Sequence, residues 1–260
     1  MQWLTGLLIL LVLLVLAIRG GQAARGLEIV ASASVGWLLV VGPVLLANPA
    51  QWGSYVSGII TATPSDSSIY GSYNLVARRV GLTQLSVGTA NGIAFILLAV
   101  LVLAVVLLAL GARRRPRVAQ LAFLAVAGLT LIDKSTQPWH VVWLLPLVAL
   151  AHPRWRTMLL WQAAVAAHFI ALMLYQSTQL GDISPQHSID MPYFVLGVLL
   201  NMVATVAVMI LVVRDVLVPE HDVVRRKRVD DPQGGIVDGA RDYATIRPMI
   251  PVTAGEPAND

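Results

Sequence analysis

The stretch IDKSTQPWHVVWLLPL, residues 132–147, decides how the chain is interpreted, because it places a polar patch between two strongly apolar segments. The patch contains an acid, a base, a histidine, a glutamine and a tryptophan: Asp133, Lys134, His140, Gln137 and Trp139. Charges beside or inside a bilayer are costly, so such a cluster is a candidate functional site. The alternative is an ordinary connecting loop with an aromatic anchor, and the residues alone leave the two interpretations evenly balanced.

The composition surrounding this patch is that of a polytopic membrane protein. Of the 260 residues, 57% are hydrophobic and 12% are charged, whereas soluble domains carry roughly a quarter charged residues. The absence of cysteine excludes disulfides, iron–sulfur clusters and cysteine-ligated zinc. The net charge of +4 comes from arginines at the ends of apolar segments, which is typical of membrane orientation signals and not of a nucleic-acid-binding face.

Apolar runs approaching the length of a membrane span recur along the chain. They cover residues 3–18, 29–46, 93–110, 118–132, 141–151, 158–175 and 193–213. The sequence therefore predicts an all-α fold with about seven transmembrane helices within residues 1–216. The fourth and fifth runs are short, so they tilt, extend into the polar patch or form a re-entrant hairpin.

The distribution of arginine predicts the orientation of these segments. Four arginines, Arg113, Arg114, Arg115 and Arg117, lie between the third and fourth runs, which makes that loop cytoplasmic by the positive-inside rule. Alternation then places the C-terminus in the cytoplasm, and the patch and the long loop 47–91 on the outer face of the plasma membrane. The first run must begin outside, which predicts that an N-terminal half is missing or is supplied by a partner membrane chain.

The long loop contains one acid, Asp66, and a segment, residues 70–82, with the pattern of a short surface helix. One side of that helix is expected to be apolar: Tyr70, Tyr73, Leu75, Val76, Val80 and Leu82. Arg78 and Arg79 would then contact lipid headgroups, or would clamp a phosphate or pyrophosphate.

The last segment, residues 217–260, has no hydrophobic periodicity and is rich in Pro, Gly, Asp and Arg, so we predict a disordered cytoplasmic tail. Its basic run is suited to contact with anionic lipid: Arg225, Arg226, Lys227 and Arg228. Neither a nucleotide-binding glycine motif nor a regular metal-ligand spacing occurs in the chain, including the acid- and histidine-containing loop 181–193. No cofactor or metal is therefore predicted.

Three stretches resemble one family of membrane enzymes. They are VGWLLVVGPVLLANPAQW (35–52), GSYNLVARRVG (71–81) and AQLAFLAVAGLTLIDKSTQPWHVVWLLPL (119–147). They are similar to the C-terminal portion of actinobacterial polyprenyl-phosphate-sugar-dependent glycosyltransferases of the GT-C architecture (glycosyltransferase family 87). The resemblance implies transfer of a sugar, expected to be mannose, from a polyprenyl phosphate donor to a cell-envelope lipid or glycan.

The resemblance also implies roles for single residues. Lys134 and His140 would lie near the donor phosphate or the acceptor hydroxyl, while Gln137 and Trp139 replace the Ser and Gln that are usual in the family. The family's catalytic aspartate has no counterpart here, so the resemblance supplies no catalytic base.

The transfer itself needs a carboxylate to accept a proton and cations to stabilise the departing phosphate. Asp133 and Asp66 are candidates for the first role, and Lys134, His140, Arg78 and Arg79 for the second. The expected substrate-binding set is therefore Lys134, His140, Gln137, Trp139, Arg78 and Arg79.

Two further functions compete with this expectation. The chain could be a non-catalytic membrane subunit that scaffolds a partner or binds a lipid-linked sugar without turnover. A small transporter is the third possibility, but no predicted span carries an acid at mid-membrane. In the first two cases the expected partners are the lipid-linked sugar donor, its acceptor and membrane lipids, without nucleic acid.

Overall fold

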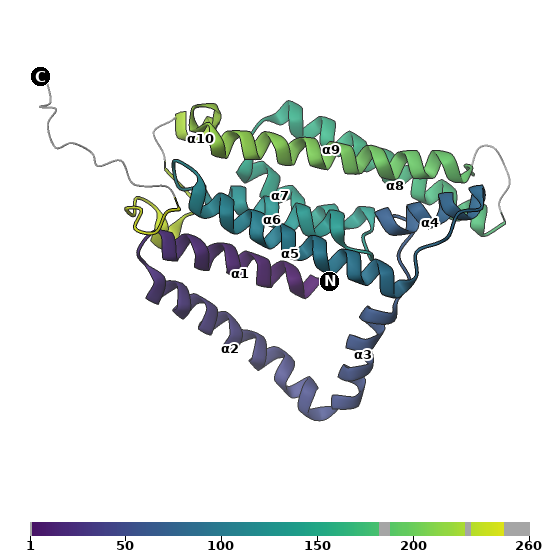
Figure 1. The fold of residues 1–260 in the computed structure, drawn as a ribbon, viewed down its shortest axis with the longest axis horizontal. Helices are drawn as coiled ribbons and strands as arrows, with labels where there is room; N and C mark the ends of the chain where they lie inside the picture. Colours follow the sequence, from purple (N-terminus) through teal and green to yellow (C-terminus); the bar gives the residue numbers. More distant parts are fainter. Residues whose placement is uncertain (1, 182–187, 227–229, 247–260) are drawn as a thin grey trace, which may run out of the picture.

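The computed structural model describes residues 2–181, 188–226 and 230–246, in which every regular element is helical (Figure 1). The longer helices are α1 (Gln2–Arg19), α2 (Ala23–Ala47), α3 (Pro49–Thr61), α4 (Ile69–Val80), α5 (Val87–Gly111), α6 (Val118–Ile132), α7 (Val141–Ala151), α8 (Trp155–Gln179) and α9 (Met191–Leu217). Each of the seven predicted apolar runs lies within one of these helices. The all-α prediction is confirmed for the described part of the chain.

Four helices, α2, α5, α8 and α9, are long and apolar enough to cross a membrane, which indicates a membrane protein. The apolar helices α1, α6 and α7 are shorter. At 1.5 Å per residue, the 15 residues of α6 extend about 22 Å, less than the roughly 30 Å of a bilayer core. Within the described residues the structure therefore supports four spans by length, and the remaining three stay a prediction.

Helix α6 forms the centre of the bundle and contacts α1, α5, α7 and α9 (Figure 1). Every residue from Ala119 to Leu129 is buried, as expected for a helix that is apolar all round. Gly128 allows a close approach to α5, because a Cβ atom there would lie 2.5 Å from a methyl carbon of Leu101. The C-terminus of this central helix carries the polar patch.

Helix α2 packs against α1 near its N-terminus and then diverges from the bundle, and α3 returns toward the bundle, so that the two helices form an open V (Figure 1). The apolar window of α2 has no buried residue, and neither has α3. Helix α3 was not predicted, although its start carries two signals: Asn48 accepts a hydrogen bond from the Gln51 N–H, and Pro49 occupies the first turn. The expected long loop 47–91 therefore contains a helix at its start.

Helix α4 forms where residues 70–82 predict a helix, but its apolar residues do not share one face. Tyr70 and Leu75 are buried, and Leu75 packs with residues of α8 and α9. Tyr73, Val76, Val80 and Leu82 are exposed. The helix therefore packs on the bundle with one side and presents a second apolar side outward.

The prediction of a disordered tail is not confirmed by its described part, residues 218–226 and 230–246. Short helical turns at Pro219–His221, Val223–Arg226 and Gly235–Val237 fold back onto the bundle. Tail carboxylates pair there with arginines at the end of α1 and in the loop between α5 and α6: Arg19–Asp242 at 2.7 Å, Arg114–Asp230 at 2.8 Å and Arg117–Asp222 at 2.8 Å. In the basic run, Arg225 is buried and donates to the Arg115 carbonyl, whereas Lys227 and Arg228 lie outside the described residues.

Candidate functional site

A cavity of about 290 Å³ lies at the end of the bundle where the polar patch follows α6. Its lining comes from α1, α3, α6, the turn 133–140 and α7: Thr5, Tyr55, Val126, Leu129, Thr130, Asp133, Ser135, Thr136, His140 and Trp143. We call it the loop-end cavity. Its volume is close to the lower limit of ordinary ligand pockets, about 300–1,000 Å³, and its walls combine hydroxyl groups, aromatic rings and one carboxylate.

Asp133 ends α6 and turns its carboxylate toward this cavity wall. The side chain is 6% exposed, and Oδ1 accepts a hydrogen bond from the Ser135 N–H at 2.9 Å. This bond across two residues fixes the turn that follows the helix. Among the described residues Oδ2 has no hydrogen-bond partner, so it can accept a proton or a hydrogen bond from a ligand.

His140 occupies the same wall, one short helical turn (Pro138–His140) before α7 begins. Its Nδ1 accepts a hydrogen bond from the Gln137 N–H at 3.3 Å, which places the proton of the neutral ring on Nε2. Burial lowers the pKa of His140, and the negative charge of Asp133 opposes that shift. The ring is therefore neutral at pH 7, with one N–H to donate.

Lys134 and Gln137 support the turn rather than line the cavity. The Lys134 side chain is 1% exposed, and its Nζ donates to the carbonyl oxygen of Ile60 at 2.8 Å. Burial lowers the pKa of Lys134, and Asp133 opposes this. Gln137 donates from Nε2 to Ser65 Oγ at 2.8 Å. The Lys134 side chain thus ties the last turn of α3 to the turn 133–140, and the Gln137 side chain ties the segment after α3 to it.

The other predicted site residues lie off the cavity. Trp139 is 49% exposed and meets the His140 ring edge-on, with centroids 6.3 Å apart. Arg78 and Arg79 are exposed in the last turn of α4. Asp66 is exposed too, and its pKa is raised mainly by desolvation, against the opposing effect of Arg78. The structure places Asp133 and His140 on the wall of the same cavity, whereas Arg78, Arg79 and Lys134 do not line it.

Apart from Asp133 and His140, the lining residues were not predicted to belong to the site, and two of them, Thr5 and Tyr55, lie far from the polar patch in sequence. Thr5 belongs to an apolar run, where a single threonine carries no signal, and Tyr55 lies in the unpredicted helix α3. The Asn48–Pro49 start of α3 could have revealed the helix. No pattern in the sequence indicates that Tyr55 approaches the end of α6.

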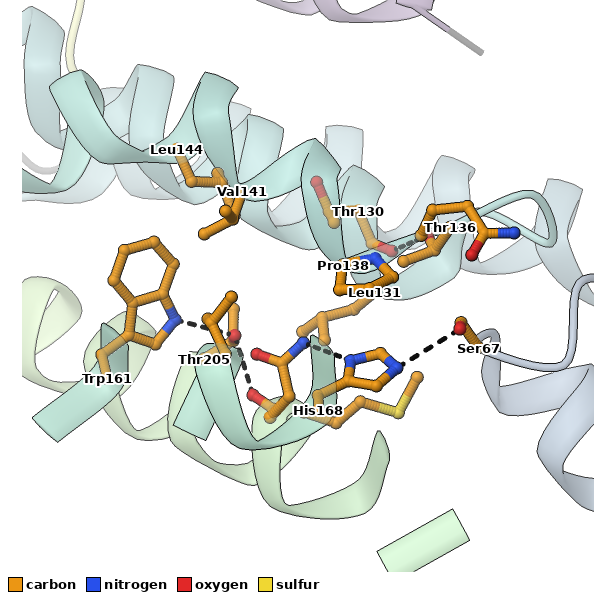
Figure 2. A pocket seen from close by; sticks show the side chains of 14 residues that line it. Ser67, Thr130, Leu131, Thr136, Pro138, Val141, Leu144, Trp161, His168 and Thr205 are labelled. Carbon is orange, nitrogen blue, oxygen red and sulfur yellow. Dashed lines mark hydrogen bonds between the residues drawn. The ribbon is translucent and has the colours of Figure 1, made fainter. Parts of the chain in front are cut away.

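A smaller cavity, about 20 Å³, lies between the α6–α7 turn and the pair α8–α9. Figure 2 shows the His168 ring reaching Ser67 beneath Leu131 and Pro138. His168 accepts at Nδ1 from the Asn201 amide at 3.0 Å, and its Nε2 lies 3.3 Å from Ser67 Oγ. In the same region Trp161 donates to Thr205 Oγ1 at 3.1 Å. This buried network gives His168 a hydrogen-bonded packing role.

The smaller cavity shares two wall residues, Thr130 and Thr136, with the loop-end cavity. The network around His168 therefore supports the turn of the loop-end cavity from the opposite side.

Within residues 2–181, 188–226 and 230–246, no group of three His, Asp or Glu side chains is arranged to hold a metal ion. Comparison of the chain with protein-family models, with curated proteins and with solved structures finds no match. The candidate site therefore stands on its own geometry: a carboxylate and a neutral imidazole on the wall of one cavity.

Proposed function

We propose that this chain is a membrane glycosyltransferase, or the C-terminal part of one, that transfers a sugar from a polyprenyl phosphate donor to a cell-envelope lipid or glycan. The observation that carries the proposal is the pairing of Asp133 and His140 on the wall of the loop-end cavity. The hydroxyl groups around them suit a sugar, and Tyr55 and Trp143 supply aromatic rings for its apolar face. The family resemblance of residues 35–52, 71–81 and 119–147 supports the same chemistry.

In the proposed reaction an acceptor hydroxyl attacks the anomeric carbon of the donor sugar. The new carbon–oxygen bond forms as the bond to the polyprenyl phosphate breaks, and the phosphate leaves with the bonding electrons. Asp133 Oδ2 takes the hydroxyl proton as general base. His140 donates its Nε2–H to the developing negative charge on the phosphate.

The proposal includes a topology. Seven helices cross the plasma membrane, with the loop-end cavity at the outer face and the C-terminus in the cytoplasm. The arginines of the loops and the tail support this orientation, because all but a few lie at the opposite end of the spans from the cavity.

A second candidate is a membrane subunit that binds the lipid-linked sugar without turning it over. It is favoured by the position of the cations. Lys134 Nζ is engaged with the Ile60 carbonyl, and Arg78 and Arg79 lie off the cavity. A departing phosphate would then need cations from a partner chain.

Reconstitution of the full chain in proteoliposomes tests both candidates. The assay supplies radiolabelled polyprenyl-phosphate mannose and a lipid acceptor extract, and it measures transferred label and bound donor separately. We expect Asp133→Asn and His140→Gln each to lower transfer by about 10²-fold or more, as for the loss of a general acid or base. Asp66→Asn is the matched control, since it removes an exposed carboxylate outside the cavity.

The outcomes separate the candidates. Transfer that depends on Asp133 and His140 supports the enzyme. Donor binding without transfer by the wild type supports the subunit. Absence of both binding and transfer contradicts the proposed donor.

A further inference from the structure

Helix α3 covers part of the loop-end cavity with little support from the bundle. It contributes Tyr55 to the cavity wall, yet none of its residues is buried, and Tyr55 itself is 57% exposed. Its main helical neighbour is α2, whose apolar window is not buried either. Apolar packing therefore does not fix the position of α3 over the cavity.

Two hydrogen bonds hold the C-terminal end of α3 instead. The carbonyl oxygen of Ile60 accepts from Lys134 Nζ and from Asn91 Nδ2, each at 2.8 Å. Ile60 lies in the last turn of the helix, where carbonyl groups lack partners within the helix and carry the negative end of the helix dipole. The Lys134 ammonium and the Asn91 amide, which belong to two other segments, both donate hydrogen bonds to this one carbonyl oxygen.

The burial of Lys134 makes this contact unusually strong. Hydrogen bonds with a charged donor are about twice as strong as neutral ones, and the Lys134 side chain is almost completely excluded from solvent. The same residue accepts the Ser65 N–H at its backbone carbonyl, at 2.8 Å. Lys134 therefore binds the end of α3 and the segment after it, and it directly follows Asp133 of the cavity wall.

The other end of α3 has no comparable attachment. It joins α2 at Asn48, where the backbone leaves the helical conformation (φ −151°, ψ 75°). The side chain of Asn48 bonds only within its own turn, to Gln51. Rotation at this junction would move Tyr55 away from the cavity without breaking apolar packing in the bundle core.

We propose that α3 is a lid over the loop-end cavity, and that Lys134 and Asn91 are positioning residues that hold it closed through the Ile60 carbonyl. Release of this carbonyl opens the cavity between α3 and α7. Lys134 thus controls access to the site instead of lining it. The proposal concerns access alone, so it holds or fails independently of the chemistry proposed for the cavity.

The test measures how fast a thiol inside the cavity reacts. The chain has no cysteine, so Thr5→Cys places a single thiol on the cavity wall, on a helix remote in sequence from the two positioning residues. The probe is a membrane-impermeant maleimide, applied to the full chain in detergent micelles without ligand. In the Lys134→Met background we expect the labelling rate to rise by about tenfold or more, the shift that loss of one charge-assisted hydrogen bond produces. In the Asn91→Leu background, which loses a neutral hydrogen bond, we expect a rise of about fivefold.

Three controls keep the result specific. Lys134→Arg retains a cationic donor and should keep the slow rate. Arg78→Met removes an exposed cation at the same end of the bundle and should also leave the rate unchanged. A thiol at Tyr73→Cys, exposed on α4 and outside the cavity, should react equally fast in every background.

A second measurement covers the case in which Lys134→Met does not fold. Spin labels at Ser57→Cys on α3 and Tyr73→Cys on α4 report the distance between the lid and the bundle by pulsed electron resonance. Asn91→Leu should broaden or lengthen that distance distribution. Unchanged labelling in the loss-of-donor variants, or an unchanged distance distribution in Asn91→Leu, would overturn the proposal.

Discussion

Replacing Asp222 by alanine should destabilise the bundle by about 3–5 kcal/mol, the usual cost of leaving one partner of a buried ion pair alone. The Arg117 and Asp222 side chains are 0% and 1% exposed. They share two hydrogen bonds, from Nε to Oδ2 at 2.8 Å and from Nη2 to Oδ1 at 3.2 Å. Loss of the carboxylate leaves a guanidinium charge without a counterion inside the protein.

The surroundings of Arg117 explain why the charge cannot escape to solvent. Its two terminal nitrogens also donate to the carbonyls of Leu150 and Ala151, each at 2.8 Å, at the end of α7. Moving the guanidinium outward would leave those carbonyls unpaired as well. The double variant Arg117→Met/Asp222→Leu should recover only part of the loss. An apolar pair can replace a buried ion pair, but it leaves the carbonyls of Leu150 and Ala151 without their donors.

The assay is unfolding in mixed micelles, followed by tryptophan fluorescence as the denaturing detergent is increased. Arg114→Ala is the control, since the Arg114 side chain is 48% exposed and a surface pair such as Arg114–Asp230 contributes at most about 1 kcal/mol. If Asp222→Ala unfolds within about 1 kcal/mol of the wild type, or no earlier than Arg114→Ala, the argument from burial is refuted.

Three further predictions follow from the geometry of single residues. Lowering the pH from about 7.5 to about 5 should destabilise the wild type more than His140→Gln, because a histidine with a lowered pKa takes up its proton more readily once unfolded. Gly71→Ala should cost about 1–3 kcal/mol or prevent folding, since its Cβ would lie 2.0 Å from the Ser65 carbonyl oxygen. Asn201→Leu should cost about 1–3 kcal/mol by leaving the buried His168 Nδ1 without its donor. The same detergent unfolding measures all three.

Each of these predictions has its own check. For the pH dependence, the difference in stability between the wild type and His140→Gln should change as the pH falls through 6.5, the ordinary pKa of histidine. If the stabilities of the two proteins fall in parallel with pH, the lowered pKa of His140 is contradicted. Gly92→Ala is the counterpart of Gly71→Ala, because nothing lies within 4 Å of a Cβ there, and alanine favours a helix. If Asn201→Leu unfolds at the same detergent concentration as the wild type, the hydrogen bond from Asn201 to His168 does not contribute to the stability of the bundle.

The apolar helices were predictable because residues close in sequence determine where each helix begins and ends. The predicted runs 118–132 and 141–151 coincide with α6 and α7, since the apolar residues stop at a charged turn on one side and resume after Pro138 on the other. Helix α3 was not predictable from hydropathy, because its stability depends on its ends and not on an apolar face. The folded part of the tail depends on ion pairs with residues about a hundred positions away, which periodicity cannot reveal.

The candidate site was likewise predictable only where its residues are close in sequence. Asp133 and His140 approach each other because both belong to one short turn, so their shared cavity follows from nearness in sequence. The orientation of the Lys134 side chain does not follow from nearness in sequence, because its partner is a backbone carbonyl 74 positions earlier in the chain. A cation beside a carboxylate suggested anion binding, but the structure directs the ammonium to the end of a helix.

The ion pairs between the tail and the arginines also have a consequence for biosynthesis. A ribosome makes the chain from its N-terminus, so Arg19, Arg114 and Arg117 emerge long before the aspartates at positions 222, 230 and 242 that pair with them. During insertion these arginines therefore carry uncompensated charge, which is the form that orients membrane segments. Their neutralisation must wait for synthesis of the tail, so the ion pairs join the tail to α1 and to the loop between α5 and α6 only after those segments have been made.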